Sequence, residues 1–82
     1  IGDAEAEVIE AEVLSTSPMA GKRIADIDFP EGVLVGAVRK GGTVTRPLGS
    51  TRIDEGDVIA LFALTKDVSE VERLMQVSID FF

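Results

Sequence analysis

The sequence predicts an α+β fold, with a small and mostly antiparallel sheet of about four strands and two helices, in a single domain over residues 1–82. Two apolar runs, Val33 to Lys40 and Val58 to Leu64, have the length and composition of buried strands. Residues 5–14 alternate charged and apolar side chains, which is typical of a strand with one face in water. A chain of 82 residues buries only about 60–65% of its extended surface, so we expect self-association to add stability.

The first helix is predicted from a capping signal. Ser17 can cap a helix N-terminus, and Pro18 suits the first helical position because it lacks an N–H. Gly21 weakens the helical pattern. We expect the helix to end before Phe29, which the following proline holds in an extended conformation.

A hairpin is predicted around Gly41-Gly42, because glycine tolerates the positive φ angles of a two-residue turn. The predicted register pairs Lys40 with Thr43, Arg39 with Val44, and Ala37 with Arg46. Strict alternation in the first strand of this hairpin predicts two apolar faces, one with Val33, Val35 and Ala37 and the other with Leu34, Gly36 and Val38. A strand that is apolar on both faces needs cover on both sides.

The last elements follow a tight turn at residues 54–57, where Gly56 takes the unusual backbone angle. Asp67 and Glu70 resemble a capping box for the second helix. Its predicted apolar face is made of Val68, Val71, Leu74 and Met75. Alternation in residues 77–82 predicts an extended tail.

Composition favours binding over catalysis. The chain has no histidine, cysteine, tryptophan or tyrosine, so the usual general bases, thiolate ligands and stacking platforms are missing. Eight basic against fifteen acidic residues give a net charge of -7, which disfavours nucleic acid and anionic lipid as partners. No apolar run approaches the ~20 residues of a membrane span, and no leader precedes Ile1, so we expect a soluble piece of a longer polypeptide.

Two arginines form the candidate effector site. Arg39 and Arg46 are expected on one face of the hairpin, about 7–8 Å apart, within reach of one phosphate or carboxylate. Surface charge that merely solubilises the hairpin is the alternative reading. Asp26, Asp28 and the turn at residues 54–57 lack the spacing of a calcium loop, so no metal site is expected.

A dimer interface is predicted from the strand that one small domain cannot cover on both faces. We expect the first helix and this strand to meet a second copy. The residues assigned to the interface are Ile24, Ile27, Val33 and Val35.

Three stretches resemble the C-terminal regulatory domain of TrkA and related RCK proteins. They are Ser17 to Lys22 (SPMAGK), Pro30 to Val33 (PEGV) and Glu55 to Ile59 (EGDVI). The resemblance covers nearly the whole chain, and the ending ERLMQVSIDFF is similar to the terminus of a bacterial TrkA, which implies the second of two such domains.

The resemblance implies a cytoplasmic regulatory domain of a Trk-type potassium uptake system, at the inner membrane through a ring that gates a channel of the TrkH type. NAD or ATP is then expected on a neighbouring Rossmann-like domain and not on this fragment, which has no glycine fingerprint. Some relatives hold cyclic di-AMP at a dimer seam with an Arg and Asn pattern, where this chain has residues 28–32, DFPEG. The alternatives are a pure dimerisation module without a ligand and, last, a small enzyme.

Overall fold

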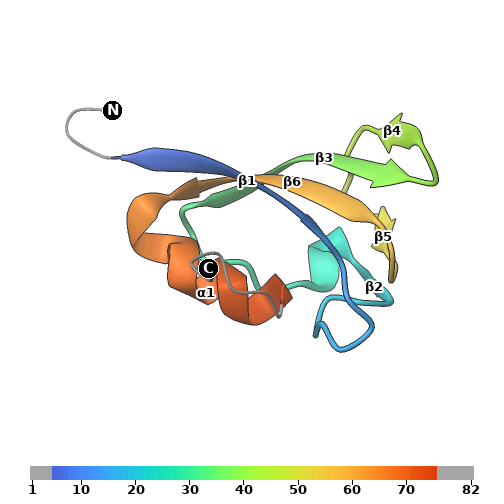
Figure 1. Cartoon of the computed structure of the whole chain (residues 1–82), viewed down its shortest axis with the longest axis horizontal. Helices are drawn as coiled ribbons and strands as arrows, with labels where there is room; N and C mark the ends of the chain where they lie inside the picture. Colours follow the sequence, from blue (N-terminus) through green and yellow to red (C-terminus); the bar gives the residue numbers. More distant parts are fainter. Residues whose placement is uncertain (1–4, 76–82) are drawn as a thin grey trace, which may run out of the picture.

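The computed structural model describes residues 5–75 and contains a main four-stranded sheet with the strand order β1-β6-β3-β4 (Figure 1). Every neighbouring pair in this sheet is antiparallel. Its strands are β1 (Ala6–Glu12), β3 (Val33–Lys40), β4 (Thr43–Thr45) and β6 (Val58–Leu64). A second, two-stranded sheet pairs β2 (Lys22–Arg23) with β5 (Arg52–Ile53). The helical elements are η1 (Ile24–Asp26), η2 (Thr65–Asp67) and α1 (Val68–Met75).

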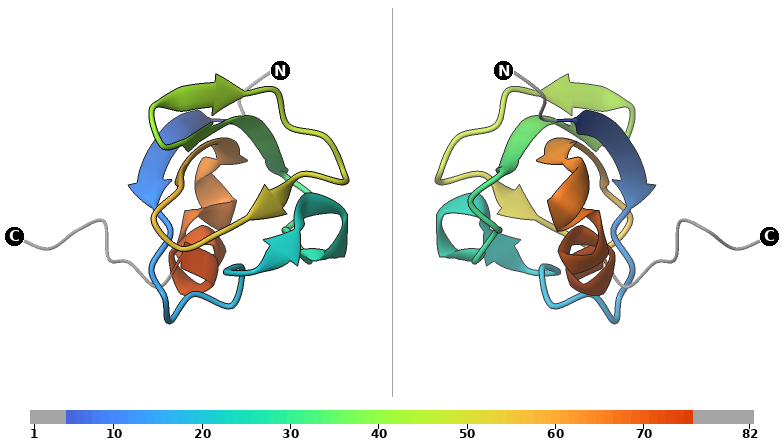
Figure 2. Two further views of the ribbon diagram at one scale, coloured as in Figure 1. Left: turned by 90° about the vertical axis from the view of Figure 1, so that its right-hand side faces the viewer. Right: turned by 90° about the vertical axis from the view of Figure 1, so that its left-hand side faces the viewer.

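The core lies between α1 and one face of the main sheet. Seen end-on, β1, β3 and β4 curve over α1, and β5 and β2 continue the curve along one flank (Figure 2). Leu61 and Ala63 of β6 point into this space together with Val71 and Met75 of α1, and all four are buried. The predicted α+β class and antiparallel sheet are therefore confirmed.

The second predicted helix is confirmed as α1, which begins at Val68. Its first-turn Glu70 accepts a hydrogen bond from Arg73 at 2.6 Å. The extended tail predicted for residues 77–82 lies outside the described residues.

The first predicted helix is wrong, because the chain reverses direction at Gly21. Gly21 has a φ of 85°, which a helix cannot contain, and its N–H donates to the carbonyl of Ile53 at 2.7 Å. Two turns, the short strand β2 and the 3-10 helix η1 occupy the segment. The capping residue was recognised correctly in one respect, since the Ser17 Oγ accepts a hydrogen bond from the Met19 N–H at 3.1 Å.

The hairpin register is confirmed at two of its three predicted pairs. Lys40 lies opposite Thr43 and Arg39 opposite Val44, and both turn glycines have positive φ. The third predicted pair, Ala37 with Arg46, lies beyond the ladder because β4 ends at Thr45. Gly56 also has the predicted positive φ, at 89°.

A β-bulge in β3 overturns the predicted division of this strand into two faces. Val35 pairs with Leu61 and Ala37 with Ala60, so Gly36 is an extra residue without a partner on β6. After one extra residue the alternation changes phase, and Val38 points to the core with 0% of its surface exposed. The strict alternation assumed from sequence had placed Val38 on the same face as Leu34.

Candidate functional site

The face of the main sheet that points away from α1 carries a set of exposed apolar side chains. We call it the outer face. It is formed by Val8, Glu10 and Glu12 of β1, Val58, Ala60 and Phe62 of β6, Leu34, Ala37 and Arg39 of β3, and Val44 of β4. Within residues 5–75, each helical element packs on the opposite side (Figures 1 and 2).

Three apolar residues form a row across the middle of the outer face. The register places Phe62 of β6 directly between Val8 of β1 and Leu34 of β3. Their exposed fractions are 49%, 67% and 67%, respectively. Antiparallel sheets with one face in water usually alternate apolar and polar residues, so an apolar outward row on a central strand indicates a contact surface.

The row exists because β6 is apolar at every position. Leu61 and Ala63 use the inward positions and are covered by the core, which leaves Phe62 to point outward. Gly36 keeps space for this ring, since a Cβ added there would lie 2.6 Å from Phe62 Cε2. The bulge and the aromatic ring therefore belong to one local arrangement.

Opposite charges flank the apolar row on its two sides. Glu10 and Glu12 lie on β1 at one edge, whereas Arg39 lies on β3 and Arg46 just beyond β4, toward the other edge. All four side chains are exposed, and none of them makes an ion pair within the part of the chain that the structure describes. The outer face is therefore acidic on one side and basic on the other.

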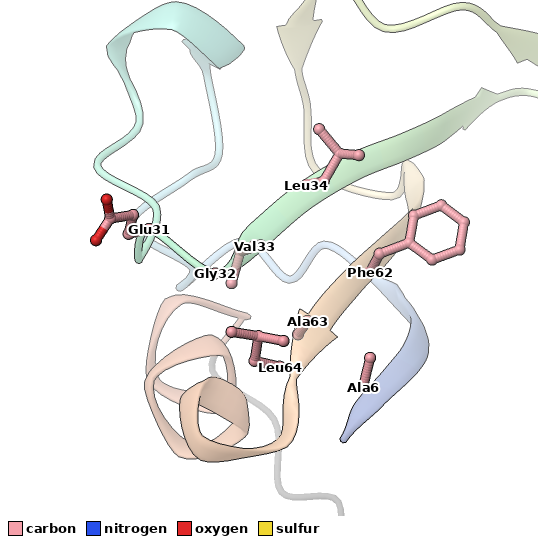
Figure 3. A pocket seen from close by; sticks show the side chains of 8 residues that line it. All are labelled: Ala6, Glu31, Gly32, Val33, Leu34, Phe62, Ala63 and Leu64. Atoms are coloured by element: carbon pink, nitrogen blue, oxygen red, sulfur yellow. The ribbon is translucent and has the colours of Figure 1, made fainter. Parts of the chain in front are cut away.

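A shallow pocket of about 380 Å³ opens at the end of the sheet where β3 begins (Figure 3). Figure 3 shows Leu34 on β3 and Phe62 on the neighbouring β6, and Glu31 is the one charged residue of the lining. The lining residues are Ala6, Glu31, Gly32, Val33, Leu34, Phe62, Ala63 and Leu64. A pocket lined mainly by apolar residues suits an apolar group.

Lys40 and two aspartates form the most buried charged cluster of the described residues. The Lys40 ammonium donates to Asp54 Oδ2 at 3.0 Å and to Asp57 Oδ2, and the Asp54 N–H donates to Asp57 Oδ2 at 2.8 Å. Burial alone lowers the pKa of Lys40, but the hydrogen bonds to Asp57 and Asp54 and the attraction of both carboxylates outweigh it, so the pKa is raised. The cluster joins β3 to the turn before β6, which is a structural role.

The effector role of Arg39 and Arg46 stays a prediction. Arg39 is on the outer face, and Arg46 follows β4 without joining its ladder. Neither arginine lines the pocket, which leaves the arginines and the pocket as separate features.

The predicted interface residues lie on the inner side of the fold. Ile27 belongs to the buried core, and Ile24, Val33 and Val35 pack against it. Their role in a dimer stays a prediction. Sequence analysis did not single out Phe62, although the continuous apolar character of β6 was a signal that one of its faces lacked cover.

Metal binding and membrane crossing by a helix each require a particular arrangement of residues, and neither arrangement occurs in residues 5–75. No group of three or more acidic residues gathers there in a way that could hold a metal ion. Every buried side-chain nitrogen or oxygen in this range has a hydrogen-bond partner, so none is left pointing at an unfilled site. In the same range, no helix has the length and apolar character that spanning a membrane requires.

These features define a small α+β domain whose distinctive surface is a sheet face suited to binding. Residues 8–76 match the TrkA-C domain family, and the chain belongs to this family. It is 46% identical over 80 residues to the Trk system potassium uptake protein TrkA of Azorhizobium caulinodans, covering 98% of this chain and 18% of that protein.

Other relatives carry similar names. The Halomonas elongata Trk system potassium uptake protein TrkA is 39% identical over 81 residues, which cover 94% of this chain and 18% of that protein. An Archaeoglobus fulgidus homolog of TrkA is 34% identical over 68 residues, which cover 83% of this chain and 16% of that protein. The chain thus spans less than a fifth of the length of these relatives.

Proposed function

We propose that this chain is a regulatory C-terminal domain of a longer TrkA-like polypeptide in a Trk-type potassium uptake system. The observation that carries this proposal is the match of residues 8–76 to the TrkA-C domain family, together with relatives named as potassium uptake proteins. The exposed apolar outer face supports a role in contacts between domains. The alternative is a pure dimerisation module that binds no small molecule.

Regulation in this proposal depends on two conformations of an assembly. The domain is part of a homo-oligomer on the cytoplasmic side of the inner membrane, and it contacts a channel subunit of the TrkH type through the full polypeptide. NAD or ATP binds a neighbouring domain. An effector changes potassium flow only if it binds one conformation more tightly than the other, since equal affinity shifts nothing.

Rubidium uptake tests the proposed function. In the A. caulinodans relative, the matched 80-residue segment is replaced by this chain, and the chimera is produced in cells that lack their own Trk uptake. We expect the chimera to restore rubidium uptake and a version lacking the segment to fail. Uptake no higher than that of the deletion, at equal protein level, would contradict the proposal.

Titration calorimetry separates the effector hypothesis from the pure dimerisation module. Nucleotides and other phosphate compounds are titrated into the chain and into the Arg39→Ala, Arg46→Ala variant. The matched control is Arg73→Ala, which removes a guanidinium from α1 on the other side of the sheet. Unchanged affinity in the double variant would remove the effector site, and the absence of heat with every compound would favour the module without a ligand.

A further inference from the structure

We propose that the outer face binds the outer face of a second copy of this chain. The two copies are related by a two-fold axis that lies between the two faces and is parallel to β6. The inference rests on the homo-oligomer in the proposed function and specifies its surface and its residue pairs. It follows from the strand register, which arranges the outer face in rows with β6 in the middle.

The rows are self-complementary under this symmetry. A two-fold axis along the central strand places β1 of one copy over β3 of the other and keeps the rows aligned. Phe62 then meets its own counterpart, and Val8 meets Leu34 of the second copy. Packed sheets keep their strands within about 30° of each other and lie about 10 Å apart, which allows these side chains to interdigitate.

Charge supports the same arrangement. Glu12 and Arg39 both lie opposite Val58, at the two ends of one row, so the two-fold axis places each glutamate over the arginine of the other copy. Glu10 falls over Ala37, one strand away from Arg46. Glu12 and Arg39, which make no ion pair within residues 5–75 of one copy, therefore obtain one in the pair.

The outer face is small for an interface, so we expect weak association of the isolated chain. Three strands about 23 Å long and the three-residue β4, each about 4.8 Å wide, give a face of roughly 400 Å² per copy, below the usual size of a stable interface. We therefore expect a dissociation constant of about 10–100 µM for the isolated chain. Such a contact strengthens when a larger assembly holds the two copies close together.

Sedimentation equilibrium from about 1 µM to about 1 mM tests the pairing with the unmodified 82-residue chain, two single variants and an equimolar mixture of the two variants. Glu12→Arg puts two arginines against each other at both symmetric positions, and Arg39→Glu does the same with two glutamates. We expect each variant alone to dimerise at least about tenfold more weakly than the unmodified chain. An equimolar mixture of the two variants pairs opposite charges again, and we expect it to associate within about threefold of the unmodified chain.

The control is Glu70→Arg, which makes the same charge change on α1, on the other side of the sheet, and leaves the dimer unchanged. Urea unfolding of each variant confirms that it folds. An unmodified chain that stays at its monomer mass of 8.7 kDa throughout overturns the inference. So do single variants that dimerise normally, or a mixture that fails to recover. Rubidium uptake by the chimera is measured separately, so loss of the dimer with uptake intact overturns only this inference.

Discussion

Replacing Lys40 with methionine tests how the charged cluster joins β3 to the turn before β6. Methionine keeps the packing of the aliphatic stem but removes the ammonium that donates to Asp54 and Asp57. In the variant, the Asp57 carboxylate still accepts the hydrogen bond from the Asp54 N–H but loses its charged partner. Because the Asp57 side chain is only 9% exposed, water replaces that partner poorly. The Lys40–Asp54 pair is half-exposed at its carboxylate and contributes little.

The expected loss in free energy of unfolding is about 2 kcal/mol. Leaving a buried polar group without its partner costs about 1–3 kcal/mol, and more when the group is charged. Lys40 itself is 33% exposed, so water reaches the site and partly replaces the lost hydrogen bond, which keeps the cost within that range. A loss of about 2 kcal/mol lowers the folded-to-unfolded ratio about 30-fold.

Urea unfolding followed by circular dichroism measures this change. With a slope of about 1 kcal/mol per M for a domain of this size, the midpoint moves down by about 2 M. All samples are compared at one protein concentration, because association of the folded state raises apparent stability.

The matched control is Lys66→Met, which removes an ammonium that is 73% exposed and lies 3.4 Å from Asp67. We expect this control to stay within about 0.5 kcal/mol of the unmodified chain. Equal midpoints for the two methionine variants would refute the reasoning that burial of Asp57 makes the Lys40 cluster important.

Three further predictions concern the same fold. The Lys40 pKa is raised in the folded state, so its contribution is full below the unfolded value of about 10.4 and is lost as the pH rises through the folded pKa. When the pH is raised from neutral to above the folded pKa of Lys40, the urea midpoint should therefore fall more for the unmodified chain than for Lys40→Met. Equal falls in the two chains would contradict this. Ser17→Ala removes a hydroxyl that donates to the Leu74 carbonyl at 2.6 Å and should cost about 1–3 kcal/mol in urea unfolding, unlike Ser50→Ala on the exposed loop. Gly32→Ala places a Cβ 2.8 Å from Leu64 Cδ1 and against the Asp67 carboxylate, so its thermal midpoint should fall. The comparison is Gly41→Ser, where an added Cβ meets no atom within 4 Å but φ is positive, so this variant tests backbone strain alone.

Local sequence signals predicted the strands and the hairpin well. The Gly41-Gly42 turn and the apolar run at residues 58–64 depend on neighbours in the chain, and both were found as expected. The prediction of a helix after Ser17 was wrong. It relied on the local cap and proline, whereas the Gly21 N–H bonds to the carbonyl of Ile53, more than thirty residues away. Tertiary hydrogen bonding decided that segment.

The candidate surface was less accessible to sequence reasoning. Strands that are apolar on both faces correctly indicated that one face of the sheet lacks cover. The extra residue at Gly36 exchanges the inward and outward positions in the second half of β3. Alternation of apolar and polar residues alone cannot locate such a bulge. The prediction therefore assigned the interface to Val33 and Val35, which pack against the core, while Leu34 and Phe62 carry the exposed apolar area. Register with β6 is what shows which side chains share a row.

Isotope-filtered nuclear Overhauser spectroscopy on a mixture of labelled and unlabelled chains tests most directly whether the outer face is a contact between copies. Val8 and Leu34 lie two strands apart in one copy, on either side of Phe62, so a signal between their methyl groups across the isotope filter can only come from two molecules. The account predicts cross-peaks from Val8 to Leu34 and between Phe62 rings. Intermolecular cross-peaks that involve only α1, or none at concentrations where the chain is dimeric, would contradict it.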